Sequence, residues 1–294
     1  MSIENHPYLN QGKISGAKGL ILGSFPVWQC TNPDSREKTE EREKTGSHRF
    51  FYGSSRNTFW KLYSKHLSPL NNNYTKQNIL DSLNKEKISI SDLIVSASRN
   101  PAKSSSDNSL KQKVFNIEGI HSLIKNGVCR ILCTSKRVLD DLEKILLSSE
   151  ESSASINKYK SDALNKLIIG AVHEKAELDK RIAIVFDTNY GIVEAISIPS
   201  PGSPYRKLKD FGFRKEITEG NKWYLDGYYK TSFKFLKVGK YTNSFIENML
   251  ELGSTKATSQ IRLKEEIIEM IENIIITRKS ASELKEMMKT MQKT

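Results

Sequence analysis

A short apolar run near the amino terminus constrains the fold of this chain more than any other feature. Leu20–Leu22 are followed directly by Gly23, Ser24 and, two residues on, Pro26. An apolar run of this length that stops at Gly and Pro is typical of a buried strand of an α/β sheet that ends in a loop. Ligands bind at the carboxyl edge of open α/β sheets, so the residues after this run are candidates for a functional site.

Strand and helix patterns alternate along the next part of the chain. Ser135 has the chemistry of a helix N-cap, Gly127 that of a residue just past a helix end, and Asn189–Gly191 that of a turn between antiparallel edge strands. The alternation predicts an α/β fold, a three-layer α/β/α sandwich with a mainly parallel central sheet. Further strands are predicted at residues 88–95, 128–133, 181–186 and 192–198, helices at 57–66, 117–126 and 136–147, and loops at 96–107 and 148–161.

Two parts of different character are expected. Residues 1–238 carry the α/β patterns, and within them residues 34–46 form a mixed-charge segment without an apolar residue, which indicates a solvated insertion. In residues 239–294 isoleucines recur at helical spacing among Glu, Lys and Arg, which predicts a C-terminal helical extension with an amphipathic helix. The apolar stripe of that helix is typical of a core or of a surface for a partner.

The chain is strongly basic. Its 294 residues include 46 Lys and Arg against 34 Asp and Glu, a net charge of +12. This charge favours a polyanionic partner, most often nucleic acid, although ribosome-associated and membrane-surface proteins share the property. The cysteines form no CxxC pair, and no apolar run approaches the roughly 20 residues that span a bilayer. We therefore expect a cytoplasmic protein without disulfides, signal peptide or membrane segment.

Several familiar catalytic motifs are missing. The sequence has no G-x-x-x-x-G-K-[ST] phosphate loop, no G-x-S-x-G nucleophile turn and no deaminase motif, and His173-Glu174 lacks the second histidine of a zinc helix. No metal or cofactor is expected. The loops after the predicted strands are rich in Ser, Pro, Asn, Arg and aromatic residues. That composition suits a backbone phosphate and a stacked base, and is less suited to chemistry that needs a strong general base.

Four segments, in order, resemble the motifs of the uracil-DNA glycosylase superfamily, nearest to its mismatch-specific and hypoxanthine-DNA glycosylase branch. They are Gly23–Pro26, Tyr52–Trp60, Asp92–Arg99 with Ser104–Asp107, and Ile198–Pro204. The resemblance covers roughly residues 17–235. It implies a monofunctional DNA glycosylase with a four-stranded core, which binds double-stranded DNA, flips a nucleotide out of the duplex and hydrolyses its N-glycosidic bond without a cofactor.

The resemblance also implies roles for individual residues. Asn57 is expected to orient the water or the base, and Ser24 belongs with it to the catalytic set. Phe25 lines the first loop, and Tyr52 stacks on the extruded base. The remaining base-binding residues are expected to be Ser54, Ser55, Thr134 and Ser135, and the DNA-binding residues Arg56, Arg99, Ser200, Ser203, Tyr205, Arg206 and Lys207.

Three departures from the family pattern bear on the substrate. Phe25 stands where many relatives have a catalytic Asp or Asn, so the water-activating role falls elsewhere. Ser54-Ser55 replace the usual His-Pro, and Thr134 stands where a base-reading Asn is common. These smaller side chains favour a roomier pocket for a bulky modified base, such as the glucosylated hydroxymethylcytosine of some phages. We therefore expect a glycosylase for a modified base that acts in phage defence.

Other interpretations of the same residues remain open. Asn57 is also a favoured helix N-cap, Phe59 and Trp60 are typical core residues, and Ser200 and Ser203 are typical of turns. The functional alternatives are a repair glycosylase for uracil or hypoxanthine, and a DNA-binding module whose glycosylase motifs have lost activity. A third is an adaptor whose C-terminal helices bind a protein partner or a second copy of the chain.

Overall fold

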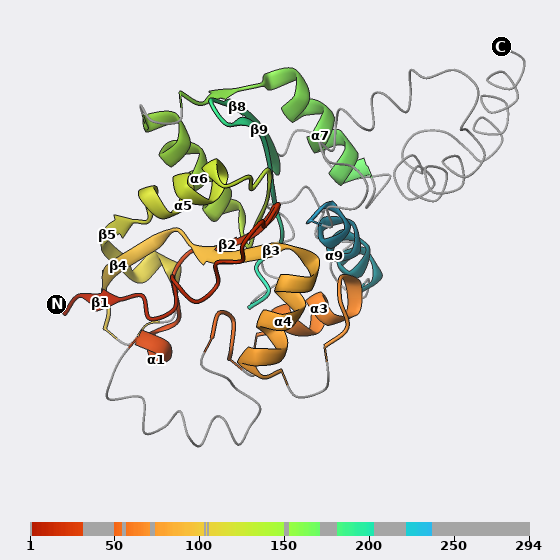
Figure 1. Ribbon diagram of the computed structural model, residues 1–294. Helices are drawn as coiled ribbons and strands as arrows, with labels where there is room; N and C mark the ends of the chain where they lie inside the picture. The colour runs from red at the N-terminus through yellow and green to blue at the C-terminus, as the bar shows by residue number, and fades with distance from the viewer. Residues whose placement is uncertain are drawn as a thin grey trace, which may run out of the picture.

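The computed structural model describes residues 2–31, 50–54, 57–70, 74–102, 104, 106–149, 153–170, 181–202 and 222–236. A six-stranded sheet forms the centre of the protein, in the order β3-β2-β6-β9-β8-β7 (Figure 1). Its strands are β2 (Gly19–Gly23), β3 (Ile88–Asp92), β6 (Arg130–Cys133), β7 (Ser155–Ile156), β8 (Ala183–Thr188) and β9 (Gly191–Ser197).

The sheet is mixed and mostly parallel. Strands β3, β2, β6 and β9 run parallel to one another, and β8 and β7 extend the sheet in antiparallel pairs. The predicted strand at Leu20–Leu22 is thus confirmed as β2, and the predicted antiparallel pair as the hairpin β8–β9, although the edge strand is β7. Gly191 has a φ of +113° in the hairpin turn, a conformation that side chains disfavour.

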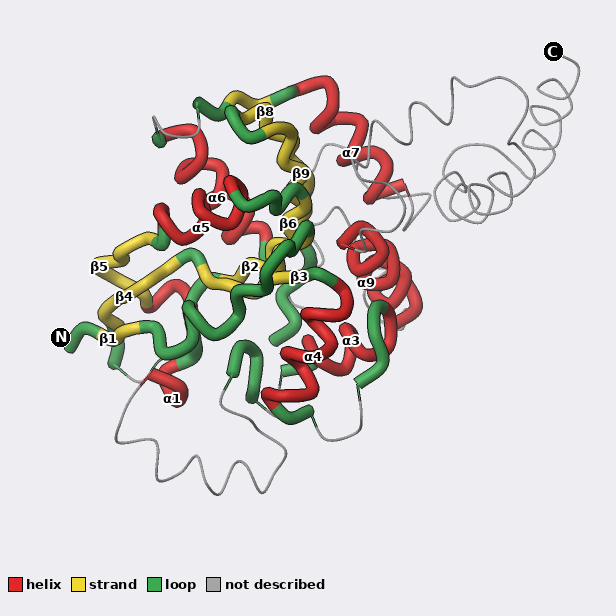
Figure 2. The backbone as a smooth tube through the Cα atoms, viewed as in Figure 1, coloured by secondary structure: helices red, strands yellow, loops and turns green. Residues whose placement is uncertain are grey.

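Helices lie on both faces of the sheet (Figure 2). Ile21 packs into a core cluster on one face, whereas Leu20 and Leu22 pack into a second cluster on the other. This division follows because successive side chains of a strand point to opposite faces. The result is an α/β arrangement in three layers. The first face carries α3 (Phe59–His66), α4 (Lys76–Glu86), α7 (Lys158–Gly170) and α9 (Lys222–Leu236), and the second α5 (Ile117–Lys125) and α6 (Lys136–Ser148).

A second, antiparallel sheet contains β1 (Glu4–Asn5), β4 (Ile94–Arg99) and β5 (Leu110–Phe115). The sequence predicted one strand over residues 88–95 and a loop over 96–107, and both boundaries are wrong. The chain leaves the main sheet at Leu93 and continues as β4, whose polar residues are buried because their partners come from distant segments. For example, the Ser98 hydroxyl donates to the Gln112 side chain at 3.0 Å.

The helix ends follow local chemistry. The Ser135 side chain accepts a hydrogen bond from the backbone N–H of Val138, which confirms Ser135 as the N-cap of α6. Gly127 follows α5 with a φ of +103°, as predicted for a residue past a helix end. The predicted loop 148–161 is wrong in part, because β7 and the start of α7 lie within it.

Two predicted regions lie outside the described residues: the insertion at 34–46 and the helical extension at 239–294. The division of the chain into two parts therefore stays a prediction. Among the helices that the structure does describe, none is long and apolar enough to cross a membrane. Two short elements complete the described fold, the helix α1 (Trp28–Thr31) and the 3-10 turn η2 (Asp107–Ser109).

Candidate active site

The candidate site lies where the order of the parallel strands changes direction. From β2 the chain passes to β3 on one side and later to β6 on the other, so the crevice at their carboxyl ends is the expected binding position in this kind of sheet. Backbone hydrogen bonds fix its floor. Thr134 N–H donates to the carbonyl of Leu22 at 2.9 Å, and Ile94 N–H donates to the carbonyl of Ser24 at 3.1 Å.

Tyr52 reaches this edge from the loop before α3. Its hydroxyl lies 3.1 Å from the Thr134 hydroxyl, and its ring packs on Phe59 with 4.6 Å between centroids. The structure therefore brings together two residues of the predicted base pocket. The backbone of Tyr52 has a φ of 53°, a left-handed conformation that is strained for an aromatic residue. Such strained backbone conformations are common at functional sites. Here the packing of the Tyr52 ring on Phe59 holds the backbone in this conformation.

Gly23 is in close contact with two oxygen atoms of the site. A Cβ atom at this position would lie closer than 3.0 Å to both the Asp92 carboxylate Oδ1 and the Tyr52 hydroxyl. These two oxygens are therefore close neighbours, on the same side of the end of β2. Only glycine leaves room for them at this point of the strand.

Two carboxylates belong to the site. Asp92 is the last residue of β3, and Asp107 accepts a hydrogen bond of 2.9 Å from the Ser24 hydroxyl. Burial raises the pKa of Asp107, and the hydrogen bond from Ser24 opposes that rise. Burial also raises the pKa of the Tyr52 hydroxyl, and the negative charge of Asp92 raises it further. No carboxylate was among the predicted site residues, and the expectation that this edge is less suited to general-base chemistry stays a prediction.

Asp92 is held by a histidine from the amino terminus. His6 Nε2 lies 2.8 Å from Asp92 Oδ2, and His6 Nδ1 accepts the backbone N–H of Tyr8 at 3.0 Å. Because Nδ1 acts as an acceptor, we assign the proton to Nε2, which then donates to the carboxylate. The His6 ring is fully buried among aromatic rings, with Phe25 at 5.8 Å and Phe51 at 5.3 Å between centroids.

Arg99, predicted to contact DNA, is buried in the structure at 5% exposure. Its Nε lies 3.0 Å from the Glu4 carboxylate, its Nη1 donates to the carbonyl of Ser104 at 2.8 Å, and its Nη2 to that of Pro26 at 2.5 Å. The guanidinium carbon also lies 5.5 Å from the centre of the Phe25 ring. Arg99 thus holds the loop after β2 in place, and its contact with DNA stays a prediction.

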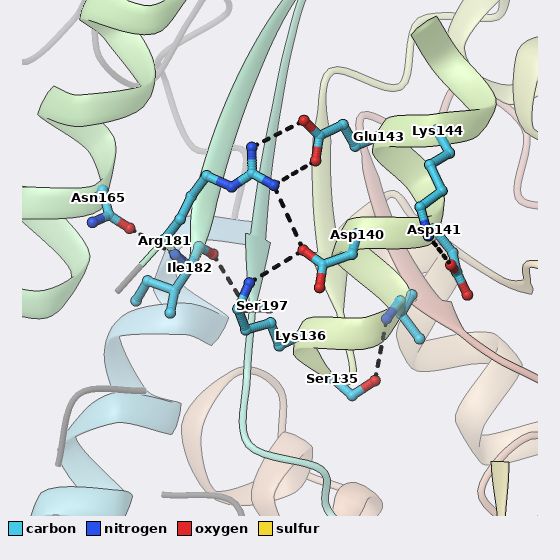
Figure 3. Close-up of polar contacts among 11 residues, drawn as sticks. Ser135, Lys136, Asp140, Asp141, Glu143, Lys144, Asn165, Arg181, Ile182 and Ser197 are labelled. Carbon is cyan, nitrogen blue, oxygen red and sulfur yellow. Dashed lines mark hydrogen bonds and ion pairs between the residues drawn. The ribbon is translucent and has the colours of Figure 1, made fainter. Parts of the chain in front are cut away.

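Asn57 and Ser135 both bind the backbone near the start of a helix. Asn57 Oδ1 accepts the backbone N–H of Phe59, the first residue of α3, at 2.9 Å, but the N-cap position of α3 is Thr58 and not Asn57 as the alternative interpretation expects. Ser135 Oγ accepts the backbone N–H of Val138 at 3.3 Å, and Figure 3 shows its side chain turned toward the first turn of α6.

Figure 3 also shows Arg181 bound by two carboxylates of α6, with Nη2 at 2.5 Å from Glu143 Oε2.

The loop after β9 lies beside the segment that contains Asn57. The Thr58 hydroxyl donates to the carbonyl of Pro201 at 2.9 Å, so the half-buried Ser200 is close to the start of α3. The Tyr229 hydroxyl of α9 donates to the carbonyl of Pro199 at 2.6 Å and anchors the loop after β9 to this helix. Six predicted site residues lie outside the described residues: Ser55, Arg56, Ser203, Tyr205, Arg206 and Lys207.

We expect the raised pKa of Asp107 to affect stability. A folded-state pKa above that of the unfolded chain means that folding takes up a proton, so the free energy of unfolding falls as pH rises from the ordinary Asp range through the raised pKa. Asp107→Asn should remove this decline, as measured by urea unfolding over a series of pH values. The exposed Asp81→Asn is the control and should keep it. If the free energy of unfolding changed with pH in the same way in the wild type and in Asp107→Asn, the expectation would be contradicted.

Sequence reasoning missed the two residues that organise the carboxylates, His6 and Glu4. Each lies far from its partner along the chain, at a sequence separation of 86 positions for His6 and Asp92 and of 95 for Glu4 and Arg99. No local pattern marks them. Asp92 lay inside the predicted strand 88–95, and only the structure places it at the end of β3.

Fold and site together define a class, an α/β protein with a polar site at the carboxyl edge of a mostly parallel sheet. Among the residues described, no group of three or more His, Cys, Asp or Glu could hold a metal ion. No family model matches the chain, and no curated protein sequence matches it either. The resemblance to the uracil-DNA glycosylases therefore depends on the motifs themselves.

Proposed function

We propose that this protein is a monofunctional DNA glycosylase that flips a modified base out of the duplex and hydrolyses its N-glycosidic bond. One observation carries the proposal. Tyr52 and Thr134 are in contact at the switch point of the parallel strands, next to Gly23, and Ser24 is the next residue along the chain. The four parallel strands equal in number the core strands that the resemblance implies.

The chemistry of base excision suits the groups at this edge. The bond breaks through an oxocarbenium-like state, with positive charge on the sugar and negative charge on the departing base. The buried Asp92 and the partly buried Asp107 would stabilise the sugar cation, because electrostatic interactions are strong where water is excluded. The Tyr52 ring offers an aromatic face for the base, and the backbone of the Ser24 loop lies beside it.

The partner and the substrate follow from charge and size. A net charge of +12 favours binding to the phosphates of double-stranded DNA. The half-buried Ser54 precedes Ser55 where relatives carry a larger His-Pro pair, and a bulky base such as glucosylated hydroxymethylcytosine would use that room. A role in phage defence is part of this proposal.

The proposal is tested by excision from duplexes that carry uracil, hypoxanthine, hydroxymethylcytosine or glucosylated hydroxymethylcytosine. Abasic sites are revealed by alkali cleavage. We expect one modified substrate to be cleaved, with the rate reduced at least about tenfold in Asn57→Ala and Ser24→Ala. Asn84→Ala removes an exposed amide at the end of α4 and should leave the rate unchanged.

Two other outcomes distinguish the alternatives. Cleavage of uracil or hypoxanthine alone would make the protein a repair glycosylase and would contradict the bulky-base substrate. Tight, salt-sensitive DNA binding without release of any base would contradict the proposed activity and support a DNA-binding module.

A further inference from the structure

The Asp92 carboxylate has one oxygen in use and one that is not. Oδ2 is bound by His6, whereas Oδ1 is buried and has no hydrogen-bond partner within the part of the chain that the structure describes. The residue as a whole is 4% exposed. A buried carboxylate oxygen without a donor is costly, and in native proteins such an atom is often part of a catalytic site.

The neighbours of Asp92 Oδ1 are residues of the candidate site. It lies at the end of β3, against Gly23 at the end of β2 and close to the Tyr52 hydroxyl, which in turn contacts Thr134. Oδ1 therefore lies beside two residues of the predicted base pocket.

His6 makes Asp92 rigid. Its Nε2–H donates to Oδ2, and its Nδ1 accepts the backbone N–H of Tyr8. The two hydrogen bonds hold the ring, and through it the carboxylate, in one orientation. The pairing of β1 with β4 places His6 there, with its own N–H bound to the carbonyl of Val95 at 2.8 Å. A carboxylate whose first oxygen is held and whose second faces a site is pre-organised for a single acceptor role.

We propose that Asp92 is the base that activates the hydrolytic water, with His6 as its positioning residue. In this step the C1′–N bond breaks and its electron pair leaves with the base. The oxygen of the water forms a bond to C1′, and one proton of the water passes to Asp92 Oδ1. This inference depends on the proposed glycosylase activity, and it assigns the role that Phe25 cannot perform.

Asp107 is the other candidate for this role, and its contacts argue against it. Its Oδ1 already accepts the Ser24 hydroxyl at 2.9 Å, and the positive charges of Arg137 and Lys113 act on it from the rim. Asp107 is also less buried than Asp92, so water has more access to it. Asp107 therefore orders the loop after β2, and Asp92 remains the carboxylate with an unused oxygen.

The test uses single-turnover excision on whichever duplex the wild type cleaves. Asp92→Asn keeps the shape of the side chain and should slow excision by at least about 100-fold, the usual contribution of a general base. Asp187→Asn is the matched control, because it removes a half-buried carboxylate on β8 that binds Asn157 at 3.0 Å. This control should retain the wild-type rate, and both variants should bind duplex DNA as the wild type does.

A second variant separates chemistry from folding. Asp92→Ala leaves space where formate can supply a carboxylate, so added formate should raise its excision rate at least about tenfold, as a general base would. It should not affect Asp92→Asn, where the space is filled. For the positioning role, His6→Gln, which can still donate to Oδ2, should retain more activity than His6→Ala.

The outcomes keep the two proposals apart. If the wild type releases no base from any duplex, the glycosylase proposal fails and the inference fails with it. If the wild type is active, the inference alone is overturned by either of two results: Asp92→Asn within threefold of the wild-type rate, or no response of Asp92→Ala to formate.

Discussion

Replacing Gly23 by alanine is expected to reduce excision by at least about 100-fold, because a displacement of about 1 Å at a reacting group has that effect. The added Cβ would overlap both Asp92 Oδ1 and the Tyr52 hydroxyl, and neither can retreat easily. Asp92 is fixed by His6, and the Tyr52 ring is packed on Phe59. The free energy of unfolding should also fall by about 1–3 kcal/mol, as for overpacking elsewhere in cores.

Gly191→Ala provides a control for this loss of stability. Gly191 has a φ of +113° in the β8–β9 turn, with open space around its Cα, so alanine strains the backbone there without touching the site. It should lower the free energy of unfolding by about 1 kcal/mol. Its excision rate, measured well below the melting temperature, should equal that of the wild type. Equal losses of excision in Gly23→Ala and Gly191→Ala would contradict a local effect at Gly23.

The second large effect is expected at the opposite end of the parallel strands. Arg130 of β6 and Glu194 of β9 are paired in register, at 3.7 Å between Nε and Oε2, with side-chain exposures of 2% and 1%. Glu194→Gln removes the carboxylate charge beside the buried guanidinium and should lower the free energy of unfolding by about 3–5 kcal/mol. Urea unfolding with the linear extrapolation measures this loss.

Two further variants test the reason for that loss. Replacing both partners, as in Arg130→Met with Glu194→Met, should recover most of the stability, because no buried charge remains. Asp141→Asn breaks a pair with Lys144, a residue that is 76% exposed, and should change the free energy of unfolding by less than about 1 kcal/mol. A similar, small effect in Glu194→Gln would show that Arg130 is satisfied without the carboxylate. The carbonyl of Phe235, to which Arg130 Nη1 donates at 3.3 Å, is one partner that would remain.

The parts of the fold that were predictable from sequence have local causes. The β2 strand follows from its apolar run, the start of α6 from the Ser135 hydroxyl, and the end of α5 from Gly127. The hairpin β8–β9 follows from its turn. In each case the residues that determine the structure lie within a few positions of one another, so pattern and structure agree.

The errors have non-local causes. The break at Leu93 depends on β4 finding β1 and β5 as partners, which the sequence of residues 88–99 does not encode by itself. The polar residues of β4 suggested a loop because their burial requires partners such as Glu4, 95 positions away from Arg99. Tertiary pairing overrides local composition at such points.

The candidate site was predictable only where it depends on local sequence patterns. The positions of Ser24 and Thr134 follow from the ends of predicted parallel strands, which meet at one edge of the sheet. The dyad of His6 and Asp92 could not be inferred, because it joins the amino terminus to a strand end through a contact of 2.8 Å. Asn57, selected for its motif, has its amide oxygen bound to Phe59, and its catalytic role stays a prediction.

The most direct test of the account is the structure of the protein bound to a duplex that carries a tetrahydrofuran abasic-site analogue. This ligand is independent of the base that is excised. We expect the sugar of the analogue to lie outside the helix, at the carboxyl ends of β2 and β6, with Asp92 Oδ1 one water molecule away from its C1′ position. An analogue that stays within the duplex, with the DNA bound to another face of the protein, would contradict the account.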